Sequence, residues 1–105
     1  MGSKASTKGT PVAAGVTLPA DCRLGVLDAL APRLREAVAS GAATFDGSAV
    51  EKVDGAAMQL LVACRRAAAA SGGRVTWGGA SDVLREAAAL LGLAAELDLP
   101  AAMPA

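Results

Sequence analysis

The sequence predicts an α/β fold: one domain with a small, mostly parallel or mixed sheet packed by about three helices. Three short strand-like segments alternate with three segments whose apolar residues recur at helical spacing, an order typical of parallel strands. Alanine, a helix former, makes up about a quarter of the 105 residues, whereas the aromatic residues are limited to Phe45 and Trp77. This length allows one domain, which we place at residues 16–99 between a flexible tail at 1–15 and a second tail at 100–105.

The first strand and the first helix are predicted from alternation and then from helical spacing. Val16-Thr17-Leu18 alternates apolar and polar residues, and Pro19 ends this short strand. After a turn-rich segment, a helix begins near Asp28 or slightly later, because Pro32 is tolerated only in a first turn. Gly41 ends this helix. Its apolar face consists of Leu27, Leu30, Ala31, Leu34 and Val38.

A second strand and a second helix follow. Ala42 to Phe45 is predicted as a short buried strand, and Asp46-Gly47-Ser48 after it has turn chemistry. Asp54 is an N-cap candidate, since its carboxylate can accept a backbone N–H one turn along. The helix that it opens runs to about Ser71, and Gly72-Gly73 closes it. Its inward positions on successive turns are Met58, Leu61, Val62 and either Cys64 or Arg65.

The third strand and the third helix complete the alternation. Arg74-Val75-Thr76-Trp77 alternates as a strand, and Trp77 is predicted to be a core residue although tryptophan is also enriched at interfaces. Ser81 or Asp82 caps the next helix, and Gly92 followed by Leu93 is typical of a Schellman stop. The segment that follows begins as a further helical turn and then becomes the Pro-punctuated tail.

Composition excludes several classes of function. Ten Lys and Arg balance ten Asp and Glu, so no basic field favours nucleic acid or an acidic membrane surface. Without histidine, imidazole catalysis and histidine metal ligation are excluded, and we expect no metal, no cofactor and no enzymatic activity. Cys22 is expected in a loop, where it is a candidate reactive thiol, and Cys64 in the core. No run has the length of a membrane span and no secretion signal is evident, which favours the cytoplasm.

The most distinctive segment runs from Thr44 to Leu61 and reads TFDGSAVEKVDGAAMQLL. It resembles the STAS family, named for sulfate transporters and anti-sigma-factor antagonists. The matching positions are Asp46, Val50, Val53, Asp54, Met58 and Leu61. The runs LGVLD at 24–28, GGRV at 72–75 and LLGL at 90–93 extend the resemblance over roughly residues 16–97. The resemblance implies a stand-alone bacterial STAS domain that acts in signalling or transcription regulation by binding proteins.

One departure from the family pattern concerns regulation. In the anti-sigma-factor antagonists, the hydroxyl residue directly after the turn aspartate is phosphorylated by a partner kinase, and the added charge breaks the complex. Here that position is Gly55, followed by Ala56 and Ala57, none of which can accept a phosphate. The resemblance therefore implies either constitutive docking or regulation that lies with the partner or at another residue. Ser48 and Ser81 are weaker phosphoacceptor candidates, because turn and cap roles explain them more simply.

We expect the docking surface at the start of the middle helix and the preceding turn. Small residues there leave backbone N–H groups uncovered at the positive end of a helix, although Asp54 would also serve as a simple cap. The predicted partner-binding residues are Asp46, Gly47, Ser48, Asp54, Gly55, Ala56, Ala57 and Met58, with Gly79 to Ser81 at the border.

The resemblance also implies a set of partners. They are an anti-sigma kinase, a histidine-kinase or chemosensory component, or a transporter ATPase, together with a weak homodimer. The alternative functions are the cytoplasmic STAS subunit of an ABC phospholipid transporter, or a STAS domain that binds a lipid or nucleotide. An Ala-lined groove would admit an acyl chain in the last case.

Overall fold

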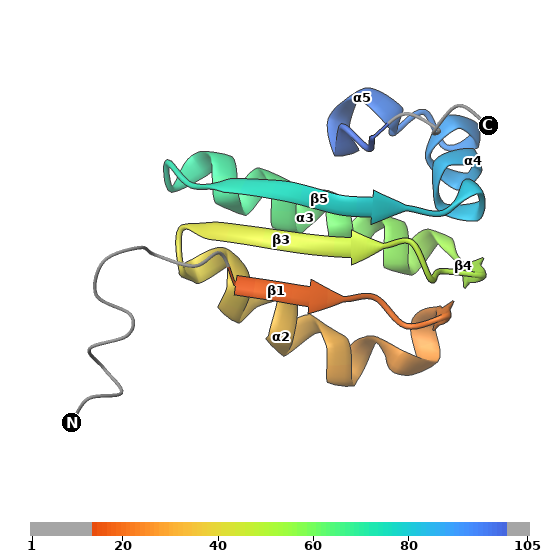
Figure 1. The fold of residues 1–105 in the computed structure, drawn as a ribbon, viewed down its shortest axis with the longest axis horizontal. Helices are drawn as coiled ribbons and strands as arrows, with labels where there is room; N and C mark the ends of the chain where they lie inside the picture. The colour runs from red at the N-terminus through yellow and green to blue at the C-terminus, as the bar shows by residue number, and fades with distance from the viewer. Residues whose placement is uncertain (1–13, 101–105) are drawn as a thin grey trace.

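A three-stranded parallel sheet forms the centre of the fold in a computed structural model, which describes residues 14–100 (Figure 1). Its strands lie in the order β1 (Ala14–Thr17), β3 (Ala42–Gly47) and β5 (Arg74–Ala80). Helices α2 (Leu27–Ala39) and α3 (Gly55–Ala70) lie side by side on one face of the sheet. Helices α4 (Asp82–Leu90) and α5 (Ala94–Leu97) follow β5. The predicted α/β class and parallel sheet are confirmed, with one short helix more than expected.

A second, two-stranded sheet lies beside the carboxyl ends of the main strands (Figure 1). It pairs β2 (Asp21–Cys22) with β4 (Lys52–Val53) in parallel. Each strand has two residues, too few for alternation to reveal them in the sequence. This small sheet ties the segment before α2 to the segment before α3, and it thereby positions the candidate site.

The core lies between the main sheet and helices α2 and α3. Along β3, Ala43, Phe45 and Gly47 are buried on the helix side, as period-2 alternation requires. Phe45 meets the edge of Trp77, with ring centroids 5.7 Å apart. The indole N–H of Trp77 donates to the Leu97 carbonyl at 2.8 Å, which joins α5 to β5. Trp77 is half-buried against the core, so the prediction of a core role is confirmed.

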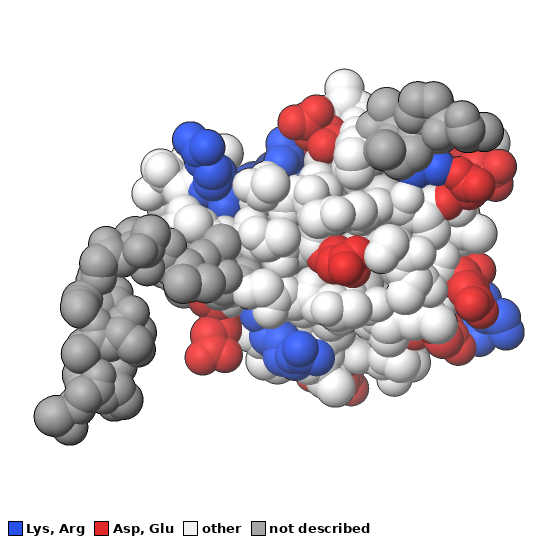
Figure 2. Space-filling model, viewed as in Figure 1, with Lys and Arg blue, Asp and Glu red and all other residues white. Residues whose placement is uncertain are grey.

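The opposite face of the sheet has no described helix over it. Thr17, Thr44 and Thr76 alternate with the buried residues of the three strands and point to this side. Figure 2 shows the face largely uncharged, with an acidic side chain over the end of β3. Every described helix that packs on the main sheet therefore lies away from these threonines.

Local chemistry sets the helix ends as predicted. Gly41, Gly72 and Gly92 have φ of 94°, 82° and 73°, and each ends one of the three longer helices. The Schellman bond from the Leu93 N–H to the Ala88 carbonyl is 2.8 Å long. At the start of α4 the hydroxyl of Ser81 accepts from the Leu84 N–H at 3.1 Å, so Ser81 is the cap.

Several predicted boundaries differ from the structure. Pro32 lies in the second turn of α2, because the 3-10 turn η1 (Leu24–Val26) leads directly into a helix that begins at Leu27. Proline has no backbone N–H, so the helical hydrogen bond from position 32 to the Asp28 carbonyl is missing. Asp28 is exposed to water. Strands β3 and β5 extend to Gly47 and Ala80, since their pairing continues past a bulge at Phe45/Asp46.

The chain ends and Cys22 also differ from expectation. Ala14 and Gly15 belong to β1 rather than to a tail, while the rest of both predicted tails, except Pro100, lies outside the described residues. Cys22 is in β2 and is buried, not in an exposed loop. Burial, together with the charges of Asp54 and Asp21, raises the pKa of its thiol, so the prediction of a reactive cysteine there is wrong.

Candidate functional site

The first turn of α3, formed by Asp54, Gly55 and Ala56, is the centre of the candidate site; we call it the docking turn. Asp54 is the N-cap, as predicted: one carboxylate oxygen accepts from the Ala57 N–H at 3.0 Å. Its other oxygen accepts from the Leu24 N–H at 2.8 Å. A single side chain therefore fixes both the start of α3 and the 3-10 turn η1, thirty residues away in the sequence.

The docking turn carries a fixed negative charge. The hydrogen bonds from Ala57 and Leu24 hold the pKa of Asp54 below its ordinary value, so this carboxyl is ionised at neutral pH. Beside it, Arg23 donates two hydrogen bonds to Asp21, at 2.7 and 2.8 Å. Because the charges of Asp21 and Arg23 offset each other, the charge of Asp54 is the net charge of these three side chains.

Small exposed residues follow the aspartate. Gly55 and Ala56 are exposed, and a Cβ atom built on Gly55 meets nothing within 4 Å. Within the part of the chain that the structure describes, the N–H groups of Gly55 and Ala56 have no acceptor, because Asp54 caps only that of Ala57. The turn therefore offers free backbone donors that no side chain covers.

Leu24 is a site residue that the sequence did not single out. Its side chain is 65% exposed, although its backbone N–H is held by Asp54. Leu24 therefore places one exposed apolar side chain next to the docking turn. The sequence feature that could have pointed to Leu24 is its place in the LGVLD run. This run matched the family pattern, but no role was assigned to it.

Three of the predicted partner-binding residues lie beneath the surface. Gly47, Ala57 and Met58 are buried, and Ala57 and Met58 pack into the core between α3 and the sheet. Gly47 lies under α4, where an added Cβ would approach Leu84 to 2.6 Å. These residues support the site from inside and present no accessible side chain to a partner.

The other predicted residues form a separate group at the end of β3. One carboxylate oxygen of Asp46 accepts from the Ser48 hydroxyl at 2.6 Å and from the Ser48 N–H at 3.0 Å. These bonds hold the pKa of Asp46 below its ordinary value. Gly79 lies against Ser48, and the Ser81 N–H donates to the Gly47 carbonyl. Across residues 14–100, no hydrogen bond connects Asp46 or Ser48 to the docking turn.

The described residues hold no evident centre for metal chemistry or membrane insertion. Among residues 14–100, no three His, Cys, Asp or Glu side chains cluster as metal ligands. None of the described helices has the length and apolar character needed to cross a bilayer. What the site can do chemically is offer a fixed carboxylate, free backbone donors and one exposed leucine.

Comparisons with known proteins give one finding. A family model described as "Mlab, STAS domain" matches residues 5–100, nearly the whole chain. The matched range includes the docking turn, Leu24 and the group at Asp46. A search of curated proteins and a search of solved structures each returned no match.

Proposed function

The chain belongs to the STAS domain family, and from that premise we propose that it is a non-catalytic protein-interaction module of bacterial signalling or transcription regulation. Its docking surface consists of the docking turn and Leu24. It acts in the cytoplasm in the manner of an anti-sigma-factor antagonist. The partner is an anti-sigma kinase, or a histidine-kinase or chemosensory component.

The observation that carries the proposal is the open space above Gly55. A partner backbone can approach the turn closely, because neither Gly55 nor Ala56 has a side chain that would hold it off. The free N–H groups of Gly55 and Ala56 favour a neutral hydrogen-bond acceptor on the partner, such as a backbone carbonyl, because the ionised Asp54 carboxylate beside them repels an acidic group. Leu24 adds an apolar contact at the side.

The same glycine removes the phosphorylation switch that the family resemblance implies. Neither Gly55, Ala56 nor Ala57 carries a hydroxyl. Ser48, the nearest hydroxyl on the N-terminal side, donates its hydrogen to Asp46 and lies outside the docking turn. Docking is therefore constitutive at this surface, and control rests with the partner.

The test places a charge where the family carries phosphate. Gly55→Asp fits the open space and adds a favourable charge to the first turn of a helix, so the domain stays folded. We expect at least tenfold less of the specific partner in pull-downs from the source organism, identified by mass spectrometry. Leu90→Asp, at a leucine that is 87% exposed on α4, is the matched control and keeps the wild-type yield.

Two other outcomes are decisive. Equal recovery with Gly55→Asp and wild type would rule out the docking turn as the contact surface. Recovery of a transporter ATPase that depends on Gly55 would keep this surface and assign the alternative function, a cytoplasmic subunit of an ABC phospholipid transporter.

A further inference from the structure

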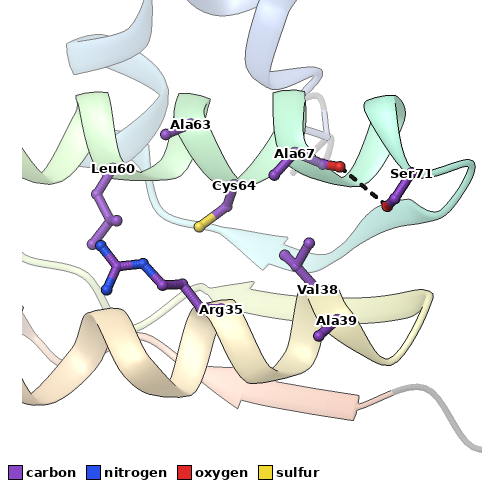
Figure 3. A pocket seen from close by; sticks show the side chains of 8 residues that line it. All are labelled: Arg35, Val38, Ala39, Leu60, Ala63, Cys64, Ala67 and Ser71. Carbon is purple, nitrogen blue, oxygen red and sulfur yellow. Dashed lines mark hydrogen bonds between the residues drawn. The ribbon is translucent and has the colours of Figure 1, made fainter.

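An open groove runs between α2 and α3 (Figure 3). Its lining residues on the α3 side begin at Leu60 and include no residue of the docking turn. Its volume is about 420 Å³, within the range of small-molecule sites. Helix α3 and its C-cap Ser71 contribute residues on successive turns from Leu60 onward, and α2 contributes Arg35, Val38 and Ala39. Nothing proposed for the docking turn requires this groove.

The shape of the groove favours a chain-like ligand. Leu60 and Ser71 are eleven positions apart on one helix face, which at 1.5 Å per residue corresponds to about 16 Å. Between them, Ala63 and Ala67 leave the wall of α3 low, and Ala39 does the same on α2. A bulky ring system would fill one turn of this trough, whereas an alkyl chain follows its length.

The wall of the groove is apolar and uncharged along most of its length. The thiol of Cys64 points toward α2 in Figure 3, and the residue is 4% exposed. Burial raises the pKa of this thiol, so it is neutral and adds no charge. The Ser71 hydroxyl already donates to the carbonyls of Ala67 and Ala68. The interior therefore offers contact to methylene groups and few polar partners.

Arg35 is the only charged residue among those that line the groove. Its guanidinium lies at the end next to Leu60 in Figure 3. Within residues 14–100 it has no ion-pair partner, because the three described pairs use Arg23, Arg66 and Arg85. The neighbouring carboxylate of Glu36 lines a different hollow, between α2 and β1. A cation at one end of an apolar trough matches an anionic head group with one hydrocarbon tail.

We propose that this groove binds a free long-chain carboxylate. The carboxylate accepts paired hydrogen bonds from Arg35, the geometry for which a guanidinium is suited. The chain lies along Leu60, Ala63 and Ala67 and covers the thiol of Cys64. The site goes beyond the proposed docking function, because it uses another surface and another class of ligand.

Laurate binding to the full-length protein, measured by calorimetry below the micelle concentration, tests the proposal. Arg35→Gln should weaken laurate binding about tenfold, the loss expected for one charge-assisted contact (~1.4 kcal/mol). Arg33→Gln, an exposed arginine on the same helix that lies outside the groove, should bind laurate like wild type. Dodecyltrimethylammonium, which has the same chain and the opposite charge, should bind at least tenfold more weakly.

A second pair of variants tests where the hydrocarbon chain of laurate lies. Ala67→Phe fills the trough at an exposed helix position and should abolish binding, whereas Ala70→Phe, exposed and outside the groove, should not. Absence of laurate binding, or equal affinity for the cationic amphiphile, overturns the proposal. Sedimentation that shows a dimer which Ala67→Phe dissociates would assign the groove to a second copy instead.

Discussion

Two Asp-Gly pairs, eight positions apart in the sequence, have opposite roles in the fold. Asp46-Gly47 ends β3, where the glycine is buried under Leu84 of α4. Asp54-Gly55 begins α3, where the glycine faces open space. Glycine is favoured at position 47 because a side chain there would press against the buried side chain of Leu84. At position 55 the chain tolerates a side chain, so the small residue there is free to serve contact with a partner.

The largest expected effect is a difference in the free energy of unfolding when the same substitution is made at each of the two glycines. Gly47→Val puts its Cβ 2.6 Å from the buried Leu84 side chain, and overpacking of this kind costs about 2 kcal/mol of unfolding free energy. Gly55→Val meets no atom and should change stability by less than about 0.5 kcal/mol. Urea denaturation measures both, and similar losses at the two positions would contradict the contrast.

The second largest effect is expected from replacing the two aspartates, because their side chains connect different parts of the polypeptide. The Asp54 carboxylate accepts from N–H groups of α3 and of η1, whereas among residues 14–100 the Asp46 carboxylate accepts only from Ser48. Asp54→Ala should therefore lower the urea midpoint at pH 7 more than Asp46→Ala does. If Asp46→Ala were the more damaging variant, the turn at Ser48 would hold the fold and the docking turn would not.

The pH dependence sharpens this comparison. Folding lowers the pKa of Asp54, so its contribution is present above the unfolded value of about 3.9 and is lost as pH falls through the folded value. The gap in urea midpoint between wild type and Asp54→Ala should narrow from pH 7 to pH 3. A gap that stays constant would show that the carboxylate charge does not matter there.

The smallest effect is expected at Ser48. Its side chain is exposed, and the hydrogen bond that its hydroxyl donates goes to Asp46, two residues earlier in the chain. Ser48→Ala should change the unfolding free energy by less than about 0.5 kcal/mol and should leave partner recovery unchanged. Loss of the partner with this variant would extend the docking surface to the end of β3.

Features that depend on local chemistry were predictable from the sequence. The order of strands and helices follows from hydrophobic spacing, and the caps at Asp54 and Ser81 follow from hydrogen bonds within one turn. Gly41, Gly72 and Gly92 end helices because each adopts a positive φ.

Features that depend on distant residues were not predictable. Gly47 is buried by Leu84, and Leu24 is brought to the docking turn by Asp54. Cys22 is buried where β2 pairs with β4, two strands too short to leave a pattern. Arg35 and Cys64 lie on different helices, so the groove between them exists only after α2 and α3 pack together.

The indole bond to the Leu97 carbonyl has a spectroscopic consequence. The chain contains one tryptophan and no tyrosine, so nearly all of its near-ultraviolet emission comes from Trp77. That ring joins β5 to α5 and meets Phe45 in the core. Detachment of the last helix would expose the indole to water and shift its emission to the red while the parallel strands remain paired. The protein thus contains a built-in fluorophore that reports on its carboxyl-terminal helix.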